Sequence, residues 1–82
     1  IAVYPNPASQ QTRISFSTST GGTVTVRLFN SMGQLVKTDL LTGLNAGNNN
    51  HVLDLDGLRP GIYSVSIGNG NNSVSTKLII TR

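Results

Sequence analysis

The chain has 82 residues, which suffice for one domain and leave no room for a second hydrophobic core. Six Lys and Arg residues stand against three Asp, and the basic residues are scattered rather than gathered in a run that could follow a nucleic-acid backbone. Cysteine is absent, which excludes disulfides and thiolate metal sites, and no apolar run approaches the ~18–20 residues that span a bilayer. We expect one domain over residues 1–82, monomeric, that binds no nucleic acid.

Along the chain, apolar and polar side chains alternate with a period of two, and no helical period is found. A short strand at residues 2–4 is expected to end at Pro5, because Pro5 and Pro7 lack a backbone donor and cannot lie inside a sheet. The segment 34–41 is less regular, which predicts a bulge or an edge position. The six longer strands are predicted at residues 12–18, 23–30, 34–41, 50–55, 61–68 and 73–81.

The inward side of these strands is predicted from the apolar rows. One-sided burial of this kind is typical of antiparallel sheets with one wet face. The predicted core comprises Ile14, Phe16, Val24, Val26, Leu28, Leu53, Leu55, Tyr63, Val65, Ile67, Val74, Leu78 and Ile80.

Turn signals separate the strands. Asn30 to Gly33 has the residues of a type I turn, residues 43–49 form a Gly- and Asn-rich loop, and Pro60-Gly61 suits a type II turn. Asn69-Gly70 indicates a tight hairpin. About seven short strands at this spacing predict two packed sheets, so we expect an all-β, immunoglobulin-like antiparallel sandwich.

Three motifs and a hairpin occur in an order that resembles a known family. The first is Tyr4-Pro5-Asn6-Pro7, the second is Leu58-Arg59-Pro60-Gly61-Ile62-Tyr63, and the third is Lys77-Leu78-Ile79-Ile80. Between the first two lies a hairpin around Gly33. Together they resemble the type A C-terminal sorting domain of proteins exported by the type IX (Por) secretion system of Bacteroidota, over nearly the whole chain.

The resemblance implies a non-catalytic sorting signal at the C-terminus of a secreted protein. Its partners would be the outer-membrane secretion machinery, a shuttle protein and a sortase-like protease, with no small-molecule substrate. The parent would pass through the periplasm and reach the outer-membrane surface or the medium. The chain starts at Ile1, without a Met or a signal peptide, so we expect it to be excised from a longer protein.

Each motif residue has a structural interpretation beside the recognition role. Pro5, Asn6 and Pro7 could end an edge strand as well as form a docking epitope. Gly61 and Tyr63 suit a turn and a core ring whose hydroxyl bonds to the backbone. Lys77 could lie on a solvated face or contact a receptor. The full set of candidate recognition residues is Pro5, Asn6, Pro7, Gly33, Pro60, Gly61, Tyr63, Lys77, Leu78, Ile79 and Ile80.

Catalytic and metal-binding chemistry is not expected. His51 is the sole histidine and has no Ser or Cys pattern beside it, so a packed or solvated role is expected. Asp54 and Asp56 lack the further ligands of a calcium loop, and Asp56 is expected to cap a turn. We predict no enzyme activity, no cofactor and no metal. The alternative function is an extracellular immunoglobulin-like or fibronectin-like binding module for carbohydrate or protein.

Overall fold

The fold is that of a computed structural model, which describes residues 1–19, 21–69 and 72–81. Over these residues the chain forms strands and no helix, so none is long and apolar enough to cross a membrane. The strands are β1 (Ala2–Tyr4), β2 (Gln11–Thr18), β3 (Gly22–Phe29), β4 (Leu35–Leu44), β5 (Gly47–Asp54), β6 (Gly61–Gly68) and β7 (Ser73–Ile80).

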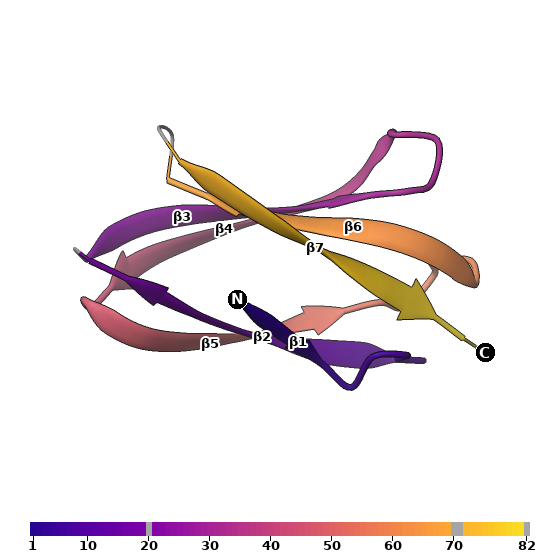
Figure 1. The fold of residues 1–82 in the computed structure, drawn as a ribbon, viewed down its shortest axis with the longest axis horizontal. Helices are drawn as coiled ribbons and strands as arrows, with labels where there is room; N and C mark the ends of the chain where they lie inside the picture. The colour runs from indigo at the N-terminus through magenta and orange to yellow at the C-terminus, as the bar shows by residue number, and fades with distance from the viewer. Residues whose placement is uncertain (20, 70–71, 82) are drawn as a thin grey trace.

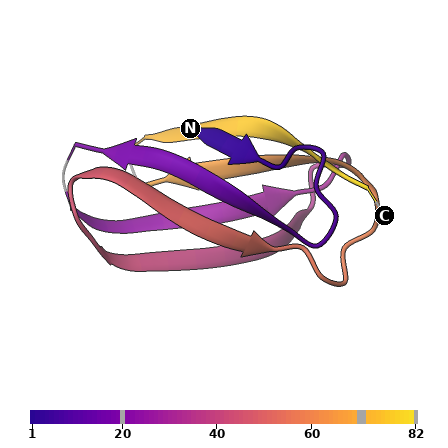
Figure 2. The same cartoon turned by 90° about the horizontal axis from the view of Figure 1, so that it is seen from below.

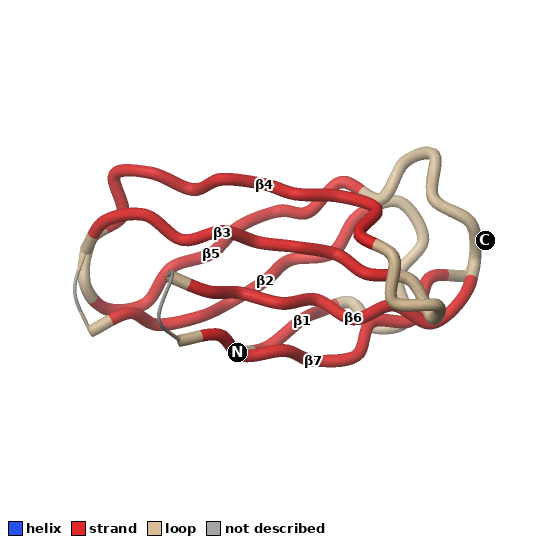
Figure 3. The backbone as a smooth tube through the Cα atoms, turned by 90° about the horizontal axis from the view of Figure 1, so that it is seen from above, coloured by secondary structure: helices blue, strands red, loops and turns tan. Residues whose placement is uncertain are grey.

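The strands form two antiparallel sheets that pack face to face, as the two layers in Figure 1 show. One sheet has the order β1-β2-β5, and the other has the order β4-β3-β6-β7. Figure 2 shows the three-stranded sheet from below, and Figure 3 shows the four-stranded sheet from above. The predicted all-β antiparallel sandwich is confirmed, and the strand order, which the sequence left open, is now defined.

The core lies between the sheets because alternate side chains on each strand point inward. Twelve of the thirteen residues predicted to be inside are buried, and Ala8 joins them. The exception is Val74, which is 53% exposed. Val74 stands near the start of β7, where the short β1 does not extend over it, and it lines an open groove with Ile1 and Phe16.

The connection between β4 and β5 differs from the prediction. Residues 43–49 were expected to form a loop, but β4 continues to Leu44 and β5 begins at Gly47. The register pairs Asn48 with Ser17 and Asn50 with Ser15 of β2. Backbone pairing with β2 therefore overrides the turn preference of the asparagines, since strand propensity depends strongly on context.

Two other expectations about the strands are met. β4 is an edge strand, and its ladder with β3 is interrupted by register shifts between Gly22 and Val24 and between Leu28 and Phe29. β6 and β7 form a hairpin in which Gly68 pairs with Ser73. Gly70, half of the predicted Asn69-Gly70 turn, lies outside the described residues.

Candidate recognition surface

Asn6 joins the first motif to the third. Its side-chain amide donates to the carbonyl oxygen of Lys77 (2.9 Å), and its Oδ1 accepts from the backbone N–H of Ile79 (2.9 Å). The side chain thus makes the two hydrogen bonds that a neighbouring strand residue would make with β7. These bonds hold together residues that are 71 and 73 positions apart in the sequence.

The chain after Asn6 continues this contact through its backbone. Ala8 donates to the carbonyl of Ile79 (2.9 Å) and accepts from the N–H of Thr81 (2.7 Å), and Ala8 pairs with Ile80 as an isolated parallel bridge. The outer edge of β7 is therefore occupied from Lys77 to Thr81. This half of β7 is therefore closed to a receptor that would bind by adding a strand to the sheet edge.

The proline segment lies against the buried side chain of Thr12. The Tyr4–Pro5 and Asn6–Pro7 peptide bonds are both cis. The carbonyl of Pro5 accepts a hydrogen bond from the hydroxyl of Thr12 (2.9 Å), whose side chain is 1% exposed. Because buried hydroxyls need a partner, this bond satisfies Thr12 and positions the segment that carries Asn6.

The hairpin around Gly33 is closed by a dense set of hydrogen bonds. Gly33 donates to the carbonyl of Asn30 (3.0 Å), Asn30 donates to that of Gln34 (2.9 Å), and Gly33 has a φ of +82°. This is the predicted type I turn, followed by a left-handed glycine, a common hairpin form. The Asn30 side chain accepts from the N–H groups of Met32 (2.9 Å) and Gln34 (3.0 Å) and donates to the Gln34 side chain (2.9 Å).

The second motif forms the corner that leads into β6. The hydroxyl of Tyr63 donates to the carbonyl of Arg59 (2.6 Å) while its ring lies in the core, as predicted. The type II turn, however, is not at Pro60-Gly61. Leu58 donates to the carbonyl of Leu55 (3.2 Å), and Gly57 has the φ of +82° that the third turn position requires.

Gly61 instead opens β6 with a φ of +156°. A φ of this size is far from the ~+80° of a type II turn, although the predicted positive φ is confirmed. The expected turn-capping role of Asp56 is also corrected, because the carboxylate of Asp54 accepts from the N–H of Asp56 (3.0 Å).

The third motif alternates between the core and the surface. Leu78 and Ile80 are buried at 0% and 1% exposure. Lys77 is exposed and Ile79 is half-buried. Ile79 is paired with Ile62 of the second motif, and Lys77 is paired with Ser64. The outward half of the third motif therefore lies beside the second motif on the outer face of the four-stranded sheet.

All four segments lie at one end of the sandwich, which we call the motif end and define as residues 5–8, 30–34, 57–63 and 77–81. The loops of this end and the C-terminus lie together at the right of Figure 3. A groove of about 470 Å³ separates the hairpin from the corner, and a second of about 440 Å³ extends from the hairpin to Lys77.

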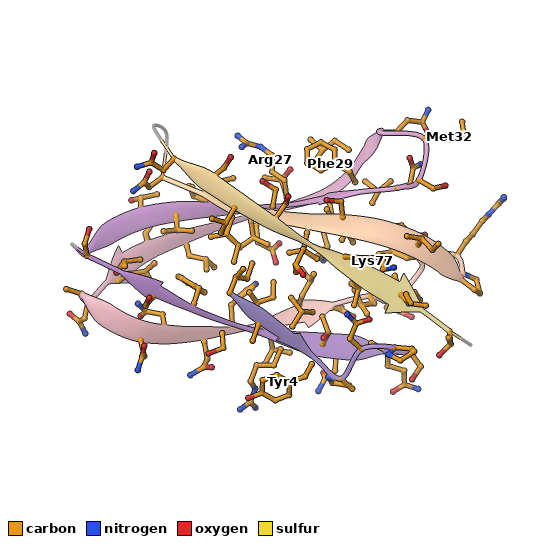
Figure 4. All side chains as sticks on the ribbon, in the orientation of Figure 1. Tyr4, Arg27, Phe29, Met32 and Lys77 are labelled. Atoms are coloured by element: carbon orange, nitrogen blue, oxygen red, sulfur yellow. The ribbon has the colours of Figure 1, made fainter. Side chains whose placement is uncertain are left out.

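The motif end also carries exposed apolar side chains. Met32 is 77% exposed and Ile62 is 54% exposed, and both line the groove between the hairpin and the corner. In Figure 4, Arg27 and Phe29 project from the outer face of the four-stranded sheet, and Met32 projects from the hairpin beside it. Grouped exposed apolar residues with a polar rim are typical of protein-binding surfaces.

His51 lies away from this end. Its Nε2 is 2.8 Å from Oδ2 of Asp39, which joins β5 to β4 along one flank of the sandwich. Within the described residues, His and Asp side chains form no group of three that could hold a metal ion.

Comparison with known protein families identifies the kind of domain that this chain forms. Residues 2–81 match the family model described as a secretion system C-terminal sorting domain, which is the sorting domain of type IX secretion. The chain belongs to this family. No curated protein sequence matches it significantly.

As a type IX sorting domain, the chain is a sorting signal for export to the cell surface or the extracellular space, and it interacts with the secretion machinery. The family is one of sorting signals rather than of enzymes. The motif residues predicted for the sorting domain are brought together at the motif end, apart from the side chains of Leu78, Ile80 and Tyr63, which point into the core.

The prediction from sequence did not include three residues that support the motif end. Asn30 was noted only as a turn residue, although its amide organises the whole hairpin. Thr12 lies in the inward row with Ile14, so the alternation itself marked a buried hydroxyl in need of a partner. Ala8 follows the prolines with no periodic signal, and its contact with β7 could not be found from local sequence.

Proposed function

We propose that the sorting domain is recognised in its folded state, through the motif end, by the outer-membrane secretion machinery. The observation that carries the proposal is the contact of Asn6 with Lys77 and Ile79. Segments separated by some seventy residues form one surface there, and that surface exists only when the sandwich is folded.

The chemistry of the motif end suits a protein receptor. The exposed apolar side chains of Met32 and Ile62 offer area to bury, and Lys77 and Arg59 add positive charge at the rim. Apolar anchors within a polar rim are the usual composition of a binding site for another protein. The outer edge of β7 beyond Lys77 is already paired, so side chains and loops at this end, rather than strand addition, would make the contacts.

The remaining steps of the route are part of the same proposal. Residues 1–82 act as one domain, and the parent protein crosses the periplasm before the outer-membrane machinery and a shuttle protein bind this end. A sortase-like protease then separates the domain from its cargo and attaches the cargo to the surface.

An extracellular immunoglobulin-like or fibronectin-like binding module for carbohydrate or protein remains the alternative, but no arrangement in the described part of the chain favours its carbohydrate form. Tyr4 and Phe29 are the two rings outside the core, and Figure 4 shows them on opposite faces of the sandwich. They therefore cannot form one aromatic platform.

The first experiment separates recognition of the fold from recognition of a linear motif. A reporter is fused ahead of residues 1–82 in a bacterium with type IX secretion, and its amount at the surface is measured. Val26→Asp leaves every motif unchanged but buries a charge at a position that is 1% exposed. A buried charge costs several kcal/mol against an expected stability of ~4–12 kcal/mol, so the variant unfolds. Export should be lost, and export of an unfolded Val26→Asp fusion would contradict the proposal.

The second experiment tests the motif end itself. The double variant Met32→Ser with Ile62→Ser removes two exposed anchors, and Leu40→Ser with Val52→Ser is the control, being exposed apolar residues elsewhere. Two contacts worth about 1 kcal/mol each weaken binding by roughly 30-fold. Surface reporter should fall for the first pair and persist for the control, with both domains folded by circular dichroism. Equal export of the two pairs would reject the motif end as the recognised surface.

A further inference from the structure

The end of the sandwich opposite the motif end is incomplete on one side. β1 pairs only with Arg13, Ile14 and Ser15 of β2, whereas β2 continues to Thr18. From Phe16 to Thr18, β2 is paired on its β5 side, but on its β1 side the described chain provides no partner. β2 thus has three residues of open strand edge directly beyond the start of β1.

The core is less well covered at the same place. Phe16, Val24 and Ile67 line a groove of about 340 Å³ and are 6%, 5% and 6% exposed, whereas Ile14 and Val65, further from it, are each 0% exposed. Val74 is much more exposed than these three residues. It lies in the inward row of β7 with Leu78 and Ile80, and yet it is 53% exposed. An inward valine that remains half in water indicates a missing covering layer.

Ile1 shows which segment would supply that layer. Ile1 directly precedes β1 and, by alternation, lies on the same inward side as Val3. It lines the groove with Val74 and is 47% exposed. In Figure 1 the N-terminus lies midway along the molecule, and β2 and β7 both continue past it toward the left. A strand that extended β1 backward would therefore run along the open edge of β2 and beneath the first half of β7.

A C-terminal sorting domain follows the protein that it exports, so chain precedes Ile1 in the family to which this domain belongs. We infer that Ile1 and the three residues before it extend β1 along Phe16 to Ser19 and cover Val74. The inference rests on family membership and not on the proposed recognition of the motif end.

The register of β1 fixes the details. Ala2 pairs with Ser15 and Val3 with Ile14, so continuing the ladder places Ile1 opposite Phe16 and the second residue before Ile1 opposite Thr18. That second residue points inward with Ile1 and Val3, because side chains alternate along a strand, and it should be apolar or β-branched. Three added residues span about 10 Å, which reaches the end of β2 at ~3.3 Å per residue.

The test is cysteine labelling in the full exported protein, purified with its cargo attached. Val74→Cys reports on the groove, and Val52→Cys is the matched control, a valine on β5 that is 46% exposed. Residues 1–82 contain no native cysteine, and the labelled peptide is identified by mass spectrometry. With the native preceding residues, the thiol of the Val74→Cys variant should react with maleimide roughly tenfold more slowly than that of the Val52→Cys variant, since reaction in the groove then requires local opening.

A second form of the protein makes the result specific. Replacing the four residues before Ile1 with Gly-Ser-Gly-Ser removes the covering side chains, and the two variants should then be labelled at equal rates. Equal rates in the native form would overturn the inference. So would protection of the groove thiol that rises with protein concentration or survives the Gly-Ser replacement, because either result assigns the groove to a second copy or to another part of the protein.

Discussion

At the scale of single residues, polar side chains rather than apolar ones decide how the ends of this chain meet. The Asn6 amide has both an NH2 group that can donate and an oxygen that can accept, which match the carbonyl of Lys77 and the N–H of Ile79. Asp in its place could accept but, when ionised, could not donate, and Ser would be too short to supply both groups. An amide at this position is therefore required by the backbone of β7.

Asn6→Ala is expected to lower the free energy of unfolding by about 1–2 kcal/mol, because two hydrogen bonds worth ~0.5–1.5 kcal/mol each are lost at an exposed site. Urea denaturation followed by circular dichroism measures the change. Asn48→Ala is the control, since Asn48 is exposed on β5, and its effect should stay within about 0.5 kcal/mol. Equal stability of the two variants would show that the Asn6 bonds contribute nothing.

Tyr63→Phe isolates the hydroxyl that bonds to Arg59. The ring stays in the core, but the carbonyl of Arg59 loses its 2.6 Å partner, so unfolding should become easier by about 1–2 kcal/mol. Tyr4→Phe provides the comparison, because Tyr4 is 51% exposed and water can solvate its hydroxyl. Thermal unfolding of both variants tests this, and a Tm for Tyr63→Phe no lower than that for Tyr4→Phe would contradict it.

At the scale of elements, alternation in the sequence was sufficient for the strands whose inward side faces a complete opposing sheet. The burial of the inward-facing apolar residues from Val24 to Leu28 and from Tyr63 to Ile67 was predicted correctly, because β3 and β6 are central strands in the four-stranded sheet. The Asn-rich start of β5 was missed, because its pairing with β2 depends on residues some thirty positions away. Val74 was missed because its exposure depends on the length of β1, which alternation in β7 cannot report.

The candidate site likewise has one part that local sequence predicts and another that it does not. The turn at Asn30 to Gly33 was predictable, since its residues interact with one another. The contact of Asn6 and Ala8 with β7 was not, because it joins opposite ends of the chain and follows no local period. The motifs could be recognised from their residues, whereas their meeting at one end required the fold.

The Asn30–Gln34 hairpin has its own testable feature. A Cβ added to Gly33 would meet no atom within 4 Å, so any cost of Gly33→Ala comes from the φ of +82° alone. We expect a loss of about 1 kcal/mol for Gly33→Ala and a smaller loss for Gly33→Asn, which tolerates the left-handed conformation better. Denaturant titration of both variants gives the order, and an alanine variant as stable as the asparagine variant would contradict it.

At the scale of the whole molecule, the sandwich is closed by its first residues. β1 adds to one sheet, and the segment that follows it adds to the edge of the other, so residues 1–8 touch both layers. Without these residues the buried side chain of Ala8, the partner of Thr12 and the covering of the β7 edge are lost together. The contribution of this segment is therefore greater than that of any single bond in it.

We accordingly expect a chain of residues 9–82 to lose about 4 kcal/mol or more, since it forfeits several hydrogen bonds worth ~1 kcal/mol each as well as buried apolar area. Against an expected total of ~4–12 kcal/mol, this loss would leave the truncated domain largely unfolded at 37 °C. Circular dichroism and one-dimensional NMR compare it with residues 1–82, and addition of a synthetic peptide of residues 1–10 should restore native signals. A truncated domain that melts at the same temperature as the intact one would show that the first strand and the Asn6 segment are dispensable for the sandwich. The fold would then persist without the contact that joins the first and third motifs.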